Sequence, residues 1–108
     1  MRENPKVKLS DITEPDQWIN LDCQVINELP SPAESIAQKL WIADHTTAIE
    51  AVLWAKAAKA GVPLLKKGKS YRLENVVTNE FRGRFSIALV STTTVREIPD
   101  MGLDEELY

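Results

Sequence analysis

The stretch YRLENVVTNEFRGRFSIAL, residues 71–89, decides the fold. Two runs rich in apolar and β-branched residues flank a short turn that holds Phe81, Arg82, Gly83 and Arg84. Glycine tolerates the positive φ that such a turn often needs, so the stretch predicts a β-hairpin. Its tip places one aromatic ring between guanidinium groups. A ring can stack on a base and a guanidinium can contact a phosphate, but the same residues can also pack on a barrel rim and keep a turn soluble.

Length and composition predict one globular domain. The chain has 108 residues, of which 44% are hydrophobic and 27% charged. We find no apolar segment long enough for a membrane span and no signal peptide, so we expect an intracellular protein, nuclear in a eukaryote and cytoplasmic in an archaeon or bacterium. The one cysteine, Cys23, and the one histidine, His45, cannot form a disulfide or a tetrahedral metal site. We therefore expect no metal, no cofactor and no catalytic residues.

The charge is unevenly distributed along the chain. The net charge is −3, but residues 56–84 hold 8 Lys/Arg against 2 Asp/Glu. Residues 1–55 hold 4 against 9, and residues 85–108 hold 1 against 5. The local field matters more than the total when a protein binds an anionic polymer. The basic block therefore favours nucleic-acid binding, while the acidic total argues against tight non-specific binding.

Alternating apolar and polar residues predict five strands, at 17–29, 36–43, 48–54, 70–78 and 84–90. An alanine- and lysine-rich run at 55–60, ended by Gly61, predicts a short helix after the third strand. This order is typical of an all-β fold, the five-stranded Greek-key OB-fold barrel with a helix between strands three and four. We expect the OB domain to span residues 9–99, between a flexible arm at 1–8 and an acidic tail at 100–108.

Four segments resemble the single-stranded-DNA-binding OB domains of replication protein A and its single-OB archaeal and eukaryotic homologues. They are VKLSDI at 7–12, IADHTTAI at 42–49, VLW at 52–54, and GKSYRL at 68–73 followed by NEFRG at 79–83. The resemblance implies base stacking by one aromatic at the end of strand three and one in the hairpin between strands four and five. Trp54 and Phe81 match these positions. Thr47 replaces the usual turn glycine, and Glu50 stands where family members often carry a basic group.

The resemblance and the basic block together predict the site residues. Trp54 and Phe81 are the stacking candidates, and Arg82 and Arg84 are the phosphate contacts. Trp41 shares the outward face with Trp54 by parity. Weaker candidates are Lys39, Lys56 and Arg72. Trp18 is assigned to structure.

These residues predict non-catalytic binding of single-stranded DNA with weak sequence specificity, in replication, repair or recombination. RNA is a possible ligand, because every base has a face that can stack. A rival prediction is a protein-interaction OB module of a larger complex, which Glu50 and the net acidity favour. The acidic tail could compete with DNA for the basic face or recruit a protein partner. The sequence leaves the oligomeric state open.

Overall fold

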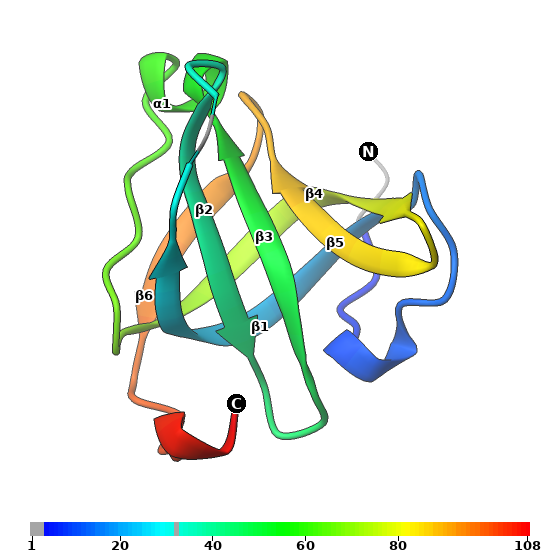
Figure 1. Ribbon diagram of the computed structural model, residues 1–108, viewed down its shortest axis with the longest axis vertical. Coiled ribbons are helices and arrows are strands. Elements are labelled where there is room, and N and C mark those ends of the chain that lie inside the picture. The colour runs from blue at the N-terminus through cyan, green and yellow to red at the C-terminus, as the bar shows by residue number, and fades with distance from the viewer. Residues whose placement is uncertain (1–3, 32) are drawn as a thin grey trace.

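The computed structural model describes residues 4–31 and 33–108. Within these residues the strands are β1 (Trp18–Leu29), β2 (Ile36–Ala43), β3 (Ala48–Trp54), β4 (Ser70–Phe81), β5 (Arg84–Leu89) and β6 (Thr94–Ile98). Helix α1 (Ala55–Lys59) follows β3, and the 3-10 turns η1 (Leu9–Asp11) and η2 (Glu105–Leu107) lie before β1 and after β6. Neighbouring strands follow the order β1-β2-β3-β5-β4, and β4 pairs back with β1, which closes the barrel (Figure 1). The predicted five-stranded OB barrel with a helix after β3 is confirmed.

The long first strand belongs to both halves of the barrel. It pairs with β4 from Trp18 to Gln24 and with β2 from Gln24 to Leu29. The register with β2 shifts between Val25 and Asn27, which leaves Ile26 as an extra residue. Such a bulge bends a strand and increases its twist, which lets β1 turn from one sheet into the other.

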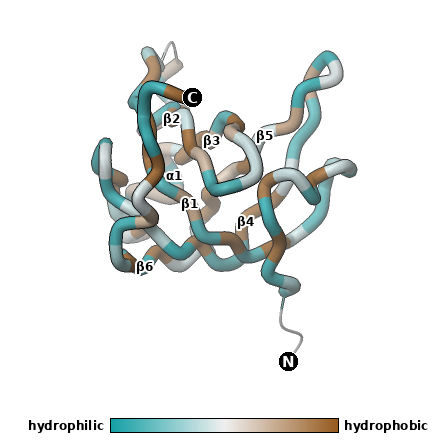
Figure 2. Tube along the Cα trace, turned by 90° about the horizontal axis from the view of Figure 1, so that it is seen from below, coloured by the Kyte–Doolittle hydropathy of each residue, from teal (hydrophilic) through white to brown (hydrophobic). Residues whose placement is uncertain are grey.

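The barrel interior is filled by the apolar residues of the alternating strands, and this alternation can be followed along the chain in Figure 2. Cys23 is one of these core residues, and burial raises the pKa of its thiol. It is therefore a small core side chain, as the sequence predicts. None of the helices in the described residues is long and apolar enough to cross a membrane.

Both ends of the chain differ from expectation. Residues 1–3 of the expected arm lie outside the described residues. Further along the arm, Val7 N donates to Asn20 O and Asn20 N donates to Pro5 O, both at 2.9 Å, so this part lies along β1. Residues 94–98 form β6, which pairs with residues 70–74 of β4 and which we did not predict as a separate strand. The acidic tail also lies against the barrel, as described below.

Candidate nucleic-acid interface

A groove of about 650 Å³ opens on the outer face of the barrel, beside β2, β3 and the β4–β5 hairpin. It is lined by Lys39, Trp41, Ala48, Ile49, Glu50, Phe81, Arg84, Phe85 and Ser86. The groove thus combines aromatic rings, cationic side chains and one carboxylate. Aromatic rings can stack on bases and cationic side chains can contact phosphates.

The strand register explains why residues far apart in the sequence share this groove. Trp41 of β2 lies opposite Glu50 of β3, and Glu50 lies beside Ser86 of β5. Ser86 lies opposite Asn79 of β4. Paired residues project from the same face of a sheet. These four side chains therefore form a row that crosses the strands on the outer face.

The predicted hairpin is present, and it exposes Phe81. Phe81 pairs with Arg84 at the end of the ladder, and Arg82 and Gly83 form the turn between them. Both turn residues have positive φ, 53° and 78°, as a type I′ hairpin requires. Phe81 is 72% exposed. The Arg82 guanidinium carbon lies 5.1 Å from the Phe81 ring centroid, within the range of a cation–π contact.

The charged groups of the groove are only partly compensated. Lys39 Nζ lies 3.5 Å from Glu50 Oε1, so the cation of Lys39 already has a carboxylate partner. Among the described residues, neither Arg82 nor Arg84 forms an ion pair. The arginines of the hairpin can therefore contact an anionic ligand without first giving up a carboxylate.

Trp54 does not line the groove with Phe81. It is 38% exposed and ends β3 opposite Ile36, where α1 begins. It lies four positions after Glu50 along β3, or about 13 Å at the rise of a strand. Trp41 instead lies in the groove with Phe81. Trp18 is 46% exposed and pairs with Val77, also outside the groove lining.

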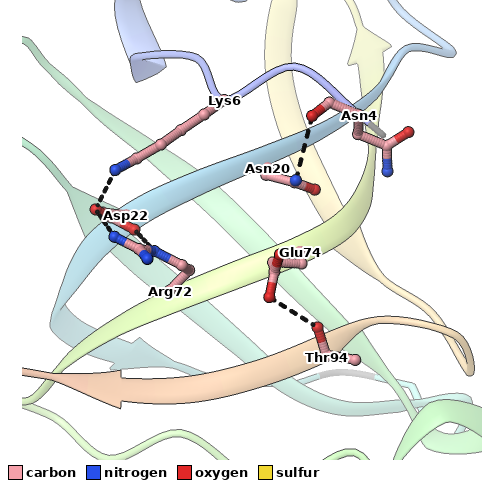
Figure 3. Close-up of polar contacts among 7 residues, drawn as sticks. All are labelled: Asn4, Lys6, Asn20, Asp22, Arg72, Glu74 and Thr94. Atoms are coloured by element: carbon pink, nitrogen blue, oxygen red, sulfur yellow. Dashed lines mark hydrogen bonds and ion pairs between the residues drawn. The ribbon is translucent and has the colours of Figure 1, made fainter. Parts of the chain in front are cut away.

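Arg72 and Lys56 lie outside the groove lining as well. Arg72 Nε and Nη2 donate to the carboxylate of Asp22 at 2.9 and 3.3 Å, and Lys6 Nζ lies 2.8 Å from the same carboxylate (Figure 3). The hydrogen bond from Arg72, together with Lys6, holds the pKa of Asp22 below its usual range against the effect of burial. Lys56 lies exposed on α1. The basic block at 56–84 is therefore spread over several parts of the barrel.

A second hollow, of about 420 Å³, shares Trp41 with the groove. Its lining adds residues of β1, the loop before β4 and the acidic tail: Ile26, Asn27, Leu29, Lys67, Glu105, Glu106 and Tyr108. Leu103 N donates to Gln24 Oε1 at 3.1 Å, and Tyr108 Oη donates to the backbone oxygen of Asp44 at 3.2 Å. These contacts hold the tail beside Trp41. The composition of the tail did not reveal this placement, because its barrel partners are distant in the sequence.

The described residues contain no group of three or more His, Cys, Asp or Glu side chains that could hold a metal ion. Asp44 is a buried carboxylate with a structural role instead. Burial alone would raise the pKa of its carboxyl, but hydrogen bonds from Leu9, Thr46 and Thr47 outweigh burial and lower it. Its carboxylate therefore fixes η1 and the β2–β3 turn to each other.

The barrel topology and the groove on β2 and β3 define an OB domain. No protein-family model and no curated protein sequence matches the chain. Among solved structures, the OB domain (residues 67–166) of MM0293 from Methanosarcina mazei is 32% identical, with a TM-score of 0.81, over 96% of this chain and 94% of that chain. The chain belongs to the OB-domain family of this archaeal protein.

Two more distant structures share the fold. Pot1pC of Schizosaccharomyces pombe, solved bound to single-stranded DNA, is 17% identical with a TM-score of 0.66, over 93% of this chain and 91% of that chain. A murine DNA-binding protein, solved bound to double-stranded DNA, is 16% identical with a TM-score of 0.62, over 90% of this chain and 49% of that chain. The closer likeness to replication protein A stays a prediction.

Proposed function

We propose that the chain is a non-catalytic OB domain that binds single-stranded DNA in the groove between β2, β3 and the β4–β5 hairpin. The observation that carries the proposal is that Trp41, Phe81 and Arg84 line the same groove. The face of strands two and three, with the loop between strands four and five, is where OB folds bind oligonucleotides. The single-stranded DNA bound to the Pot1pC relative supports the same ligand class.

The residues divide into two roles. Trp41 and Phe81 stack on bases, and each stacked base contributes about 1–3 kcal/mol. Arg82 and Arg84 contact phosphates, with Lys39 contributing less because Glu50 partly offsets its charge. Trp54, Lys56 and Arg72 are outside the lining of this groove, so a role for them requires a ligand that extends beyond it. Two or three phosphate contacts predict a salt slope of about −2 for a single strand.

A protein-interaction role is the second candidate. Trp18 and Trp54 are 46% and 38% exposed outside the groove lining, and exposed aromatic side chains are typical of protein interfaces. The acidic tail is a further candidate surface for a protein partner. These surfaces would serve a domain that joins a larger assembly in replication, repair or recombination inside the cell.

Fluorescence anisotropy tests the proposal with labelled oligo-dT, oligo-rU and duplex DNA across a salt series. We expect oligo-dT to bind at low salt with a slope of about −2, and duplex DNA to bind much more weakly. Equal binding of oligo-rU would extend the ligand class to RNA. Stronger binding of duplex DNA would contradict single-strand selectivity. Failure of every nucleic acid to bind at low salt would overturn the proposal and favour the protein-interaction role.

A further inference from the structure

Glu50 is an unexpected residue in a groove for a polyanion. Its carboxylate lies at the centre of a row of side chains that runs from Asn27 and Trp41 through Glu50 to Ser86 and Asn79. Every member of the row carries a hydrogen-bonding group, since the indole of Trp41 also has an N–H donor. A carboxylate repels phosphate, so a structure built only for backbone contacts would not need it at this position.

Lys39 holds this carboxylate in place. The two side chains are about one-third exposed, 30% for Lys39 and 36% for Glu50, with Nζ 3.5 Å from Oε1. In the part of the chain that the structure describes, no other ion pair engages the Glu50 carboxylate. Each carboxylate oxygen can accept two hydrogen bonds, so Oε2 and the second acceptor site of Oε1 are available to a ligand, while Lys39 offsets part of the charge.

We propose that Glu50 reads the base that stacks on Trp41 and that it selects guanine. This inference rests on the proposed function of the groove. Opposite residues of an antiparallel pair have Cβ atoms about 4.5–5.5 Å apart, so a base on the Trp41 ring lies within reach of Glu50. Bases in single strands are commonly recognised through their Watson–Crick edges.

The chemistry of a carboxylate determines which base it prefers. An ionised carboxylate only accepts hydrogen bonds, and its two oxygens can accept a bidentate pair. Guanine presents two adjacent donors on its Watson–Crick edge, N1–H and the N2 amine. Cytosine and adenine present one amine beside a ring-nitrogen acceptor. Thymine and uracil present one N–H between two carbonyl oxygens, which the carboxylate repels. Stacking reads sequence poorly, so Glu50 supplies a preference that Trp41 and Phe81 cannot.

The competing explanation is that Glu50 only forms a surface ion pair with Lys39. A second lysine–glutamate pair in the molecule provides a matched control. Glu97 of β6 pairs with Lys69 at 3.3 Å, outside the groove lining. Glu50→Gln and Glu97→Gln each remove one negative charge from a lysine–glutamate pair and keep the side-chain shape. Both raise the affinity for any anionic oligonucleotide slightly. Only Glu50→Gln changes the order of preference among bases.

The test measures affinities for an oligo-dT of about nine nucleotides, within the site size of one OB fold, in which a single dG is placed at each position in turn. We expect one position to favour dG over dT by about tenfold, the scale of a bidentate contact, with dC and dA between them. Deoxyinosine, which lacks the N2 amine, should lose most of this gain. In Glu50→Gln the ratio of dG to dT affinities should fall close to one, and in Glu97→Gln it should stay at the wild-type value.

The outcomes separate this inference from the proposed function. Binding of oligo-dT with no preference at any position overturns the role of Glu50 and leaves the single-strand site standing. A ratio of dG to dT affinities that is unchanged in Glu50→Gln likewise overturns the role of Glu50 and leaves the single-strand site standing. Absence of binding to every oligonucleotide overturns both. Thermal unfolding of each variant confirms that it is folded before its affinities are compared.

Discussion

The groove face and the face formed by β1, β4 and β6 differ in how they use charge. On the second face, Asp22 is bound by both Arg72 and Lys6 (Figure 3). Lys69, just before β4, pairs with Glu97 of β6. On the groove face, the arginines of the hairpin form no ion pair within the described residues, and the Phe81 ring is 72% exposed. On the second face Arg72 has a carboxylate partner, although Arg96 opposite it forms no ion pair among the described residues. The groove face differs because its unpaired arginines lie beside an exposed aromatic ring.

This difference shows why a count of basic residues is a poor guide to a binding surface. Arg72 and Arg84 belong to the same basic block of the sequence, but only Arg84 faces the groove. A cation that is already hydrogen-bonded to a carboxylate must lose that partner before it can bind phosphate. The predictions below test whether the two faces differ in function as they differ in structure.

Removing the groove aromatics should have the largest effect. We expect Phe81→Ala and Trp41→Ala each to weaken binding of oligo-dT by about 1–3 kcal/mol, the contribution of one stacked base. Phe81→Ala should leave the free energy of unfolding nearly unchanged, because the ring is mostly exposed. Leu64→Ala is the control, since Leu64 is 58% exposed but outside the groove lining. Wild-type affinity in Phe81→Ala would contradict the stacking role.

Removing one arginine from each face should separate the two surfaces. Arg84→Gln should reduce the steepness of the salt slope by about 0.7, the value for one phosphate contact to a single strand. Arg72→Gln should leave the slope unchanged, because Arg72 binds Asp22 on the opposite face. Anisotropy titrations across a salt series measure the slope of each variant. If Arg72→Gln changed the slope as much as Arg84→Gln, the charge distinction between the faces would be wrong.

The turn residue Arg82 should show a conflict between stability and binding. It adopts a φ of 53°, a left-handed conformation that costs most residues about 1–2 kcal/mol but that asparagine tolerates well. Arg82→Asn should therefore raise the melting temperature and weaken binding of oligo-dT at low salt. Thermal unfolding and anisotropy together check this. An increase in stability with no loss of affinity would show that Arg82 does not contact the ligand.

The acidic tail should have a smaller effect. Glu105 and Glu106 line the hollow that shares Trp41 with the groove, so they repel a phosphate bound beside this ring. We expect the double variant Glu105→Gln, Glu106→Gln to bind oligo-dT about twofold more tightly at low salt, with the difference disappearing at high salt because of screening. A difference that persists at high salt would indicate a change of structure instead of charge competition.

The face formed by β1, β4 and β6 should respond to acid, with a small effect on the stability of the fold. The pKa of Asp22 in the folded chain lies below its ordinary value of 3.8, mainly because Arg72 hydrogen-bonds to it. The ionised carboxylate therefore stabilises the folded state above that value, and this contribution is lost as the pH falls through the lower folded pKa. Denaturant unfolding across the acid range should show a smaller loss of stability in Asp22→Asn than in the wild type. The same acid loss in both proteins would contradict this role.

The sequence predicts much of the fold because the fold depends on local patterns. Alternation predicts the barrel strands within a few residues, and Gly83 correctly indicates the hairpin. Parity also places Trp41 and Glu50 on one outward face. Parity shows which face a side chain is on, but it does not give the register between strands. Here the register depends on the pairing of β3 with β5, whose residues are distant in the sequence. For this reason the sequence predicts Trp54 and Phe81 as the stacking pair, whereas it is Trp41 that lines the groove with Phe81.

Partners far apart in the chain account for the other differences. Arg72 was a candidate phosphate contact, but Asp22, 50 residues earlier, binds its guanidinium. The tail was treated as separate because nothing in its composition indicates that Leu103 hydrogen-bonds with Gln24. Both cases depend on the closed barrel, which brings together segments that local sequence patterns cannot relate.

The most direct test of the groove uses tryptophan fluorescence with a single reporter. The chain has three tryptophans, and the variant Trp18→Phe, Trp54→Phe keeps only Trp41. We predict that oligo-dT quenches the emission of Trp41 with saturation at low salt, and that adding Phe81→Ala shifts the titration to higher concentrations. A variant that keeps only Trp54 should respond weakly. If Trp54 alone responded, or if Trp41 emission stayed constant while anisotropy showed binding, the ligand would bind elsewhere and the central claim would be wrong.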